Sequence, residues 1–422
     1  MSSESQMVTP ERALATAPGR LSRQAVMGWL GAIALGLVGF FLTVEQAPQR
    51  AWQSVWSNFL FWTAIAQAGV MFGAILHTAK GHWGKMFRRV AEGMGAFLPL
   101  SLVLFIVLYF GAGHVFPWLR PVDAHVNRTW LTLDGVFIRD GILLLILYAA
   151  SFVFLRMSLR PDARAIAEGS SGWRKKLLEG MSRNWRGDAE EVARSTTGLA
   201  RMGPVLILTW AVVFTVLAID FGMSLIPGFI SVVWGPYYFI GGWLSMLALL
   251  AVLTNRYRQR YDLGEFWGKW EFHDLGKLYF AFTVFWTYLW FSQYLVIWYG
   301  NISRETIFFE QRTAPGFAFW FWLQLILIFA IPFALLLFRN PKMRSGYLAF
   351  VALFTLAGFW LERYNMVVPS IWTEGAPPMG WQELFISVGF VGLFGLSYSV
   401  FASTFPKVPI YDTLPGKASR GP

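Results

Sequence analysis

Ten stretches of apolar residues, each long enough to cross a bilayer as a helix, constrain this chain more than any other feature. A hydrocarbon core of about 30 Å is crossed by about 20 helical residues. Lipid offers no partner to an open backbone, so we expect an all-α polytopic membrane protein. The stretches lie near residues 25–44, 52–78, 90–112, 135–155, 203–222, 228–254, 277–300, 316–338, 346–364 and 382–404.

The composition agrees with a membrane protein. Hydrophobic residues make up 56% of the 422 residues and charged residues only 14%, whereas about a quarter of the residues of a soluble domain are charged. A soluble chain this apolar would expose large hydrophobic patches to water. The composition therefore excludes an ordinary soluble protein.

The distribution of Lys and Arg predicts the orientation. With the N-terminus inside, 28 of the 35 basic residues fall in inside segments and 7 in outside segments. Cytoplasmic loops carry such an excess, which explains the net charge of +11 without nucleic acid. We expect both termini in the cytoplasm. The cytoplasmic loop 156–202 is expected to hold short amphipathic helices or to be a flexible tether, and the tail after Pro406 to be an extended strap over a neighbour or disordered.

Residues that bind metals and redox groups are scarce. The chain has no cysteine and five histidines, so it forms no disulfide, thiolate metal site or iron–sulfur cluster. The histidines fall at predicted helix ends or in loops, not in facing pairs within the helices. We therefore expect this chain to bind no metal and no haem, and any electron transfer to use metal centres in partner proteins.

Ionisable residues at the outer ends of the predicted helices form a first candidate site, because charge at membrane depth is costly and often functional. A carboxylate there can accept a proton from a quinol hydroxyl, and an arginine can hold the quinone carbonyl. The alternative is a set of ion pairs that anchor the helix ends. The candidates of this outer cluster are His114, Asp134, Arg139, Asp140, Asp220, Glu362 and Arg363.

A second set, at the inner ends and between the clusters, is a candidate proton path from the cytoplasm. Three of its members, near residue 275, are spaced three and four residues apart and so share a helix face. The alternatives are helix capping by Asp274 and bonding between neighbouring helices by the uncharged groups. The candidates are His77, Glu92, Gln67, His273, Asp274, Lys277, Thr287 and Tyr294.

One 30-residue run carries a resemblance to a known family. Residues 273–302 read HDLGKLYFAFTVFWTYLWFSQYLVIWYGNI. This run resembles a signature of the NrfD-like, polysulfide-reductase-type membrane subunits of bacterial alternative complex III, and it is most similar to the second of the two. Two shorter stretches resemble the same subunit, Gly235-Pro236-Tyr237-Tyr238 and Arg88-Arg89-Val90-Ala91-Glu92. The length and the number of spans agree over nearly the whole chain.

The resemblance implies an architecture of two four-helix bundles with a flanking helix before and after them. The expected units are a cytoplasmic N-terminal segment (1–24), a first flanking helix (25–50), a first bundle (51–222, including the loop 156–202), a second bundle (223–367), a last flanking helix (368–405) and a cytoplasmic tail (406–422).

The resemblance also implies a function in the bacterial plasma membrane. The chain would be a subunit of a respiratory quinol:cytochrome c or quinol:terminal-oxidase oxidoreductase, contributing quinol binding, proton transfer or assembly without a redox centre of its own. The implied partners are a sister NrfD-like subunit, an iron–sulfur protein, cytochrome c subunits, small membrane anchors, a terminal oxidase and lipid. Haem c and iron–sulfur clusters would lie in the partners, and quinol or quinone and lipids beside this chain.

Two alternatives stay open at this point. A secondary transporter uses helices broken by Gly or Pro near the midplane, and Pro332 lies within the eighth predicted span, while Pro227, Gly235 and Pro236 lie around the sixth. A purely structural scaffold for redox partners is the other alternative. Haem absorbance in a co-purified complex separates a complex subunit from a transporter, and mutation of the outer carboxylates separates a proton-transferring subunit from a scaffold.

Overall fold

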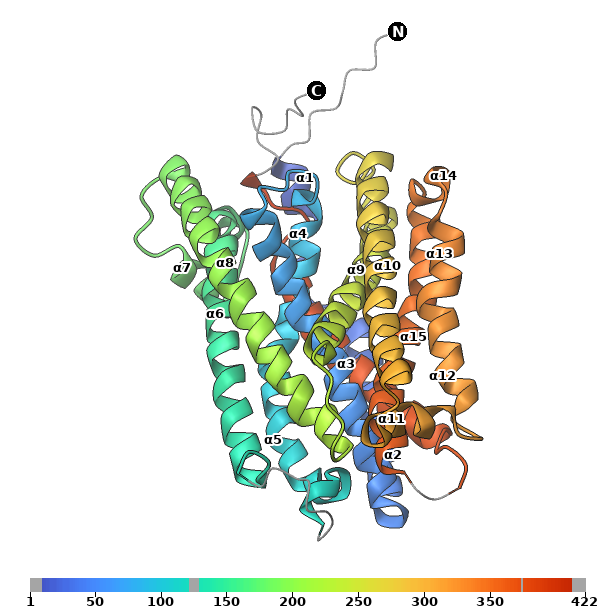
Figure 1. The fold of residues 1–422 in the computed structure, drawn as a ribbon. Coiled ribbons are helices and arrows are strands. Elements are labelled where there is room, and N and C mark those ends of the chain that lie inside the picture. Colours follow the sequence, from blue (N-terminus) through green and yellow to red (C-terminus); the bar gives the residue numbers. More distant parts are fainter. Residues whose placement is uncertain (1–9, 121–128, 373–374, 412–422) are drawn as a thin grey trace.

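The computed structural model describes residues 10–120, 129–372 and 375–411. Within these residues all regular structure is helical (Figure 1), which confirms the predicted all-α class. Ten helical segments of the described chain are long and apolar enough to cross a bilayer, so the chain is a multi-pass membrane protein. They are α2 (Arg23–Gln46), α3 (Pro48–Thr78), α4 to α5 (Lys85–Val115), α6 (Leu133–Glu168), α8 (Asp188–Phe221), α9 (Trp234–Tyr261), α10 (Lys269–Gly300), α12 to α13 (Ala318–Leu336), α15 (Ser345–Ile371) and α16 (Trp381–Thr404).

Shorter helices begin, interrupt or connect these spans. They are α1 (Pro10–Ala15), α4 (Lys85–Glu92), η1 (Gly93–Phe97), α5 (Leu98–Val115), η2 (Pro117–Leu119), α7 (Gly172–Met181), η3 (Met223–Leu225), α11 (Ser303–Thr313), α12 (Ala318–Leu325), η4 (Ile326–Ala330), α13 (Ile331–Leu336) and α14 (Arg339–Lys342).

Contacts divide the spans into two groups that meet at α3 and where α8 packs on α9. The first helix group is α3, α5, α6 and α8, in which α6 packs on α8 and α3 packs on α5 and α8. The second helix group is α9, α10, α12 to α13 and α15, in which α9 packs on α10 and α15. Because α3 also contacts α9 and α15, it joins the two groups and is almost completely buried.

The first and last spans, α2 and α16, pack on each other more extensively than any other helix pair. Their backbones meet at Gly36 and Gly389, where a Cβ added to Gly36 would lie 2.4 Å from Gly389 Cα. Small residues allow such close approach between helices in lipid. This pairing places the two ends of the helical chain side by side.

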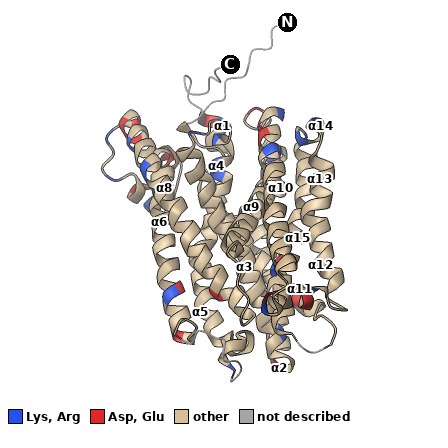
Figure 2. Ribbon diagram, viewed as in Figure 1, with Lys and Arg blue, Asp and Glu red and all other residues tan. Residues whose placement is uncertain are grey.

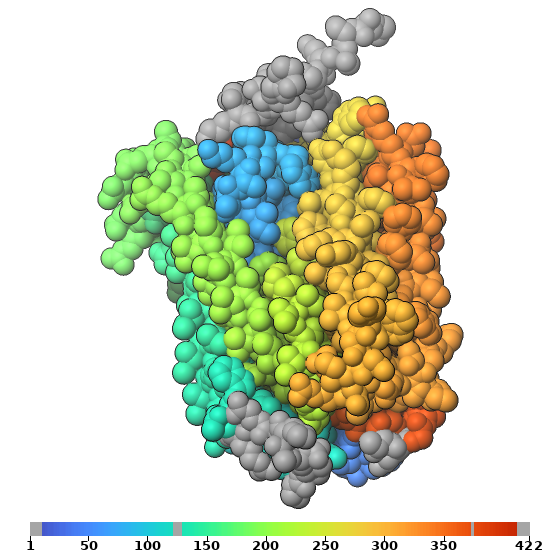
Figure 3. All heavy atoms as spheres, viewed as in Figure 1, coloured from blue at the N-terminus to red at the C-terminus, as the bar shows by residue number. Residues whose placement is uncertain are grey.

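The first and last described segments, which begin with α1 and end with residues 405–411, lie side by side at one end of the molecule, here named the termini side, as expected for an even number of spans (Figure 1). Charged residues gather toward the two ends of the helices and leave a largely uncharged middle zone (Figure 2). In the space-filling view, the segment around α4 fills the opening between α8 and α10 at the termini side (Figure 3). The charge distribution matches a bilayer as the surrounding solvent.

The structure differs from the predicted spans in three places. Helix α15 continues to Ile371, seven residues beyond the predicted end of the ninth span, so the predicted unit boundary between 367 and 368 falls inside it. The eighth span contains a π-helical turn at Ile326–Ala330, just before Pro332, which has no N–H to donate to the preceding turn. Much of the loop 156–202 is a continuation of α6 and α8, with the short helix α7 between them.

Candidate functional site

The ends of α6 and α8 opposite the termini side hold a buried group of two acids and one arginine. Arg139 donates from Nε to Asp220 Oδ2 at 3.1 Å and also from Nη2 to the same oxygen. Trp130 Nε1 donates to Asp220 Oδ1 at 2.8 Å, and the Arg139 guanidinium stacks 3.8 Å from the Trp130 ring centroid. Asp140 is 1% exposed and lies close enough to interact with both Asp220 and Arg139. We name these four residues the acid group.

The acid group contains one more carboxyl than guanidinium. Asp220 accepts hydrogen bonds on both oxygens, whereas neither oxygen of Asp140 accepts one from a residue that the structure describes. A buried ionised carboxylate is costly unless it is paired. The acid group therefore buries one carboxyl, Asp140, that no hydrogen bond from the described residues stabilises in its charged form.

A hollow of about 220 Å³ adjoins the acid group. Trp130 belongs to both, and Ser224 is the one hydroxyl residue of the lining; it donates to the Asp220 carbonyl at 2.6 Å and accepts from Trp118 Nε1 at 3.3 Å. The size and the apolar lining suit one ring with few polar substituents. The lining is Trp118, Trp130, Leu131, Ile219, Met223, Ser224, Ile226, Pro227, Gly228, Phe229 and Ile230.

At the termini side of the same helix group, Arg89 of α4 joins two buried acids. Its Nη1 lies 2.7 Å from Glu92 Oε2 and its Nη2 lies 2.5 Å from Asp162 Oδ2 of α6. Ser158 donates to Glu92 Oε1 at 2.5 Å, and all four side chains are at most 3% exposed. Arg88 adds a second guanidinium, 3.6 Å from Glu92. We name Arg88, Arg89, Glu92, Ser158 and Asp162 the ion network.

His77 of α3 is tied to this network through Arg88, whose Nη1 lies 2.8 Å from His77 Nε2. The close packing of α4 on α3 makes this possible, because a Cβ on Gly69 would lie 2.4 Å from the Ala91 carbonyl oxygen. The network has two carboxyls and two guanidiniums, so its charges balance when all four are ionised.

Helix α6 carries polar residues on one face from the ion network to the acid group. They recur at helical spacings of three, four, seven or eight residues, which place side chains on one face. Over 22 residues, at about 1.5 Å each, the stripe covers about 33 Å, close to the thickness of a hydrocarbon core. Its members, all buried, are Asp162, Ser158, Ser151, Tyr148 and Asp140.

Each member in the middle of the stripe has a buried partner on a neighbouring helix. Gln67 Nε2 of α3 donates to Ser151 Oγ at 2.9 Å, and Tyr148 and Ser101 of α5 share a 2.8 Å hydrogen bond. Apolar gaps of about 10 Å and about 12 Å separate these pairs from Ser158 and from Asp140 along the helix axis. The stripe and its partners are named the polar track. Its hydrogen-bonded groups are separated by apolar gaps, so water molecules would have to fill these gaps to form a continuous hydrogen-bonded chain.

The second helix group holds a buried cluster with the opposite charge balance. Glu362 pairs with Arg363 at 2.7 Å, and Arg363 Nη2 donates to the Tyr238 carbonyl at 3.0 Å. Arg312 of α11 is 1% exposed and donates to the Phe308 and Met366 carbonyls at 2.8 and 3.0 Å and to Ser370 Oγ at 2.8 Å. This arginine cluster, Arg312, Glu362 and Arg363, has one guanidinium more than carboxyl.

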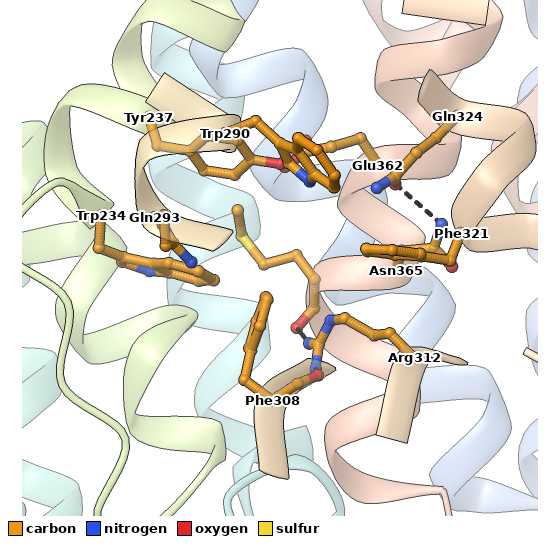
Figure 4. Close-up of a pocket in the computed structure, with 11 residues that line it drawn as sticks. Trp234, Tyr237, Trp290, Gln293, Phe308, Arg312, Phe321, Gln324, Glu362 and Asn365 are labelled. Carbon is orange, nitrogen blue, oxygen red and sulfur yellow. Dashed lines mark hydrogen bonds between the residues drawn. The ribbon is translucent and has the colours of Figure 1, made fainter. Parts of the chain in front are cut away.

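A small cavity of about 10 Å³ lies against the arginine cluster (Figure 4). Tyr237 and Trp290 lie on one side of it, Phe308 and Arg312 on the other, and Gln324 accepts a 2.8 Å hydrogen bond from Asn365 at its edge (Figure 4). A cavity of this size has room for about one water molecule. It is too small for a ring.

The structure brings together only part of the predicted outer cluster. Arg139, Asp140 and Asp220 form one group, but Glu362 and Arg363 belong to the other helix group and lie within α15 rather than at its end. Asp134 is exposed and accepts a 2.8 Å hydrogen bond from Tyr109. His114 is also exposed, at the end of α5.

The predicted proton-path residues likewise divide. His77, Glu92 and Gln67 belong to or adjoin the polar track. The others lie on α10. Asp274 lies 2.9 Å from the Lys277 amino group and 3.9 Å from the His273 ring. Thr287 donates to the Thr283 carbonyl of its own helix at 2.9 Å. Tyr294 stacks on Trp290, 5.6 Å between ring centroids, near the small cavity. These α10 residues belong to the second helix group.

Sequence reasoning missed Asp162, Ser158, Arg89 and Arg312 as site residues. The first two are visible in the sequence as polar residues four apart, followed at helical spacings of seven and eleven residues by Ser151 and Asp140, once α6 is extended beyond residue 155. Arg312 lies in a segment predicted to be an outside loop, and no sequence signal marks it as buried.

No protein-family model and no curated protein sequence matches the chain.

Proposed function

We propose that this chain is a membrane subunit of a quinol-oxidising respiratory complex, and that its own part is to move protons along the first helix group. Two observations support this: the resemblance of residues 273–302 to alternative complex III subunits, and the polar track through α6. The partners proposed are the sister NrfD-like subunit, an iron–sulfur protein and cytochromes c, which carry the electrons. The termini side is then the cytoplasmic side of a bacterial plasma membrane.

The single observation that carries the proton-transfer part is that one face of α6 holds a titratable residue at each end and hydroxyl groups between them. Purely structural polar residues need no such alignment across the membrane. Buried acids inside a membrane protein line ion or proton routes more often than they serve packing.

The residues have distinct parts in this proposal. At the cytoplasmic end, Asp162 and Glu92 accept protons, and Arg89 holds the two carboxyls in place while it limits their repulsion. The hydroxyls of Ser158, Ser151 and Tyr148 can each donate and accept a hydrogen bond, so a proton can pass through them to and from water. At the far end Asp140 takes the proton, and Asp220 holds Arg139 beside it.

The hollow beside Trp130 favours a second contribution, the binding of a quinol ring. A ring in the hollow would lie against Trp130 and Ser224, which donate hydrogen bonds to the carboxylate and the backbone carbonyl of Asp220, so the carboxylates of the acid group would accept the protons released as it is oxidised. The electrons would pass to metal centres of the partner subunits.

Two measurements test the proposal. A tagged chain purified in mild detergent should bring down haem absorbance; a colourless, solitary protein would favour a transporter. In the assembled complex, Asp220→Asn should lower quinol-driven proton translocation by about tenfold or more, whereas the matched control Asp134→Asn, on the exposed partner of Tyr109, should leave it unchanged. Full activity and full translocation in assembled Asp220→Asn complexes would favour a scaffold.

A further inference from the structure

The segment that follows α16 lies across the termini-side end of the first helix group. Residues 405–410 have no regular structure, yet all six are buried, with Val408 0% and Ile410 4% exposed. A chain end without its own helix or strand is usually exposed. Something specific therefore holds this segment, here named the strap (residues 405–411), in place.

The strap ends on the polar track. The Ile410 N–H donates to Asp162 Oδ1 at 3.2 Å, on the carboxyl whose other oxygen binds Arg89. Asp162 is 1% exposed. Its carboxyl is the part of the α6 stripe nearest the termini side, so the strap covers the point where water would reach the track.

Lys407 fastens the strap to the N-terminal segment. Its N–H donates to Thr16 Oγ1 at 2.8 Å, and its Nζ donates to the Thr16 carbonyl at 3.1 Å and to the Ala402 carbonyl. Just before the strap, Arg174 Nη2 donates to the Thr404 carbonyl at 2.8 Å. The N-terminal segment and the strap are therefore hydrogen-bonded to each other over the first helix group.

The N-terminal segment is itself held by the second helix group. Arg12 of α1 binds Glu265 at 2.9 Å and the Asp262 carbonyl at 3.3 Å, in the connection between α9 and α10. The strap is thus linked to the second group through the N-terminal segment, whereas Asp162, which it covers, belongs to the first.

We propose that the strap closes the cytoplasmic mouth of the polar track over Asp162, and that its release is what admits water and protons from the cytoplasm. This inference rests on the proposed function for its role, but the covering of the track by the strap is testable without it.

The amino group of Lys407 makes the closure sensitive to pH. It is buried among Tyr257 and Tyr261 of α9, with ring centroids 5.3 and 5.9 Å away, and the nearby charges are Arg260 of α9 and Arg174 of α7, both positive. Burial, with a smaller contribution from these two arginines, lowers the pKa of Lys407 to about 7. No carboxylate of the described chain pairs with it.

The sign of the effect follows from proton linkage. The closed strap favours neutral Lys407 and so binds fewer protons than the released strap, in which the pKa returns toward 10.5. The equilibrium constant for strap closure is therefore largest above pH 10.5. It falls by up to about tenfold per pH unit as the pH drops toward 7, and it is constant below 7. Acidification of the cytoplasm from pH 8 to 7 loosens the strap.

Cysteine labelling tests the closure, because the natural chain has no cysteine. Ser158→Cys places one thiol beneath the strap, and it is tested with a water-soluble methanethiosulfonate reagent in native membranes. Truncation after Thr404 removes the strap and should speed labelling by about tenfold or more, whereas truncation after Tyr411 keeps it and should not. A thiol at Ser151→Cys, seven residues deeper on α6, should react more slowly than the one at Ser158→Cys throughout.

A point variant covers the case in which the truncated chain does not accumulate. Val408→Asp places a charge at a fully buried position and should raise labelling in the same way, with Val408→Ala as the matched control. Equal labelling rates with and without the strap would overturn the inference. Faster labelling with unchanged proton translocation, measured in the same truncations without the Ser158→Cys substitution, would keep the strap as a cover and contradict the proton route of the proposed function.

Discussion

The two helix groups bury charge in opposite ways. The first holds acids at both ends of one helix face, and its acid group contains one more carboxyl than guanidinium. The second holds a single cluster, with a guanidinium to spare, against a cavity with room for about one water molecule. Spare acid that is aligned across the membrane can relay protons, whereas a spare guanidinium stays charged and holds carbonyl groups in place. Under the proposed function, the first group transfers protons and the second supports the structure.

The largest difference should come from Arg89→Met in the first group. Arg89 is the guanidinium that joins Glu92 and Asp162, so its loss removes the positive charge that these two buried carboxyls share. We expect a loss of about 3–5 kcal/mol of stability, measured by thermal or denaturant unfolding of the purified protein. Arg12→Met, at an ion pair whose arginine is 43% exposed, is the control and should cost less than about 1 kcal/mol.

Arg312→Met in the second group should cost less. The variant loses hydrogen bonds to two carbonyls and to Ser370, but Glu362 keeps Arg363 as its partner and no buried acid is left alone. We expect about 1–3 kcal/mol in the same assay. A loss as large as that of Arg89→Met would contradict the difference in charge balance between the groups.

The smallest effect concerns the cavity beside Arg312. Gln293 and Asn365 both line it and present amide groups, so it suits one ordered water molecule. We expect a single water density there in a high-resolution map, and its loss in Gln293→Leu at a cost of about 1 kcal/mol or less. Density the size of a ring would show that this cavity, rather than the hollow beside Trp130, takes a quinol.

The sequence was enough to predict the ten spans and the all-α class, because hydrophobic length decides both in lipid. Of the seven residues of the predicted outer cluster, the structure brings Arg139, Asp140 and Asp220 together. It failed at Glu362 and Arg363, which look like the end of a span because they are charged. The helix continues past them, since their mutual ion pair allows two charges to be buried within it.

Pairing across helices was the part that the sequence left open. Arg89 and Asp162 are 73 residues apart, and nothing in the spacing of either indicates that they meet. The strap is a similar case: the tail after Pro406 was predicted to be an extended cover or disordered, and the hydrogen bond from Ile410 to Asp162 shows that residues 406–411 form a cover. The rest of the predicted tail, 412–422, lies outside the described residues. Local patterns specify which residues face inward, whereas their partners depend on how helices pack.

Proton translocation per quinol oxidised, measured for the purified complex in proteoliposomes, tests the central claim most directly. Asp140→Asn in the first group is compared with Glu362→Gln in the second, with assembly checked by native gel. The account predicts a loss of about tenfold or more for Asp140→Asn and a change within about twofold for Glu362→Gln. Equal losses in both variants, or a loss confined to Glu362→Gln, would contradict it.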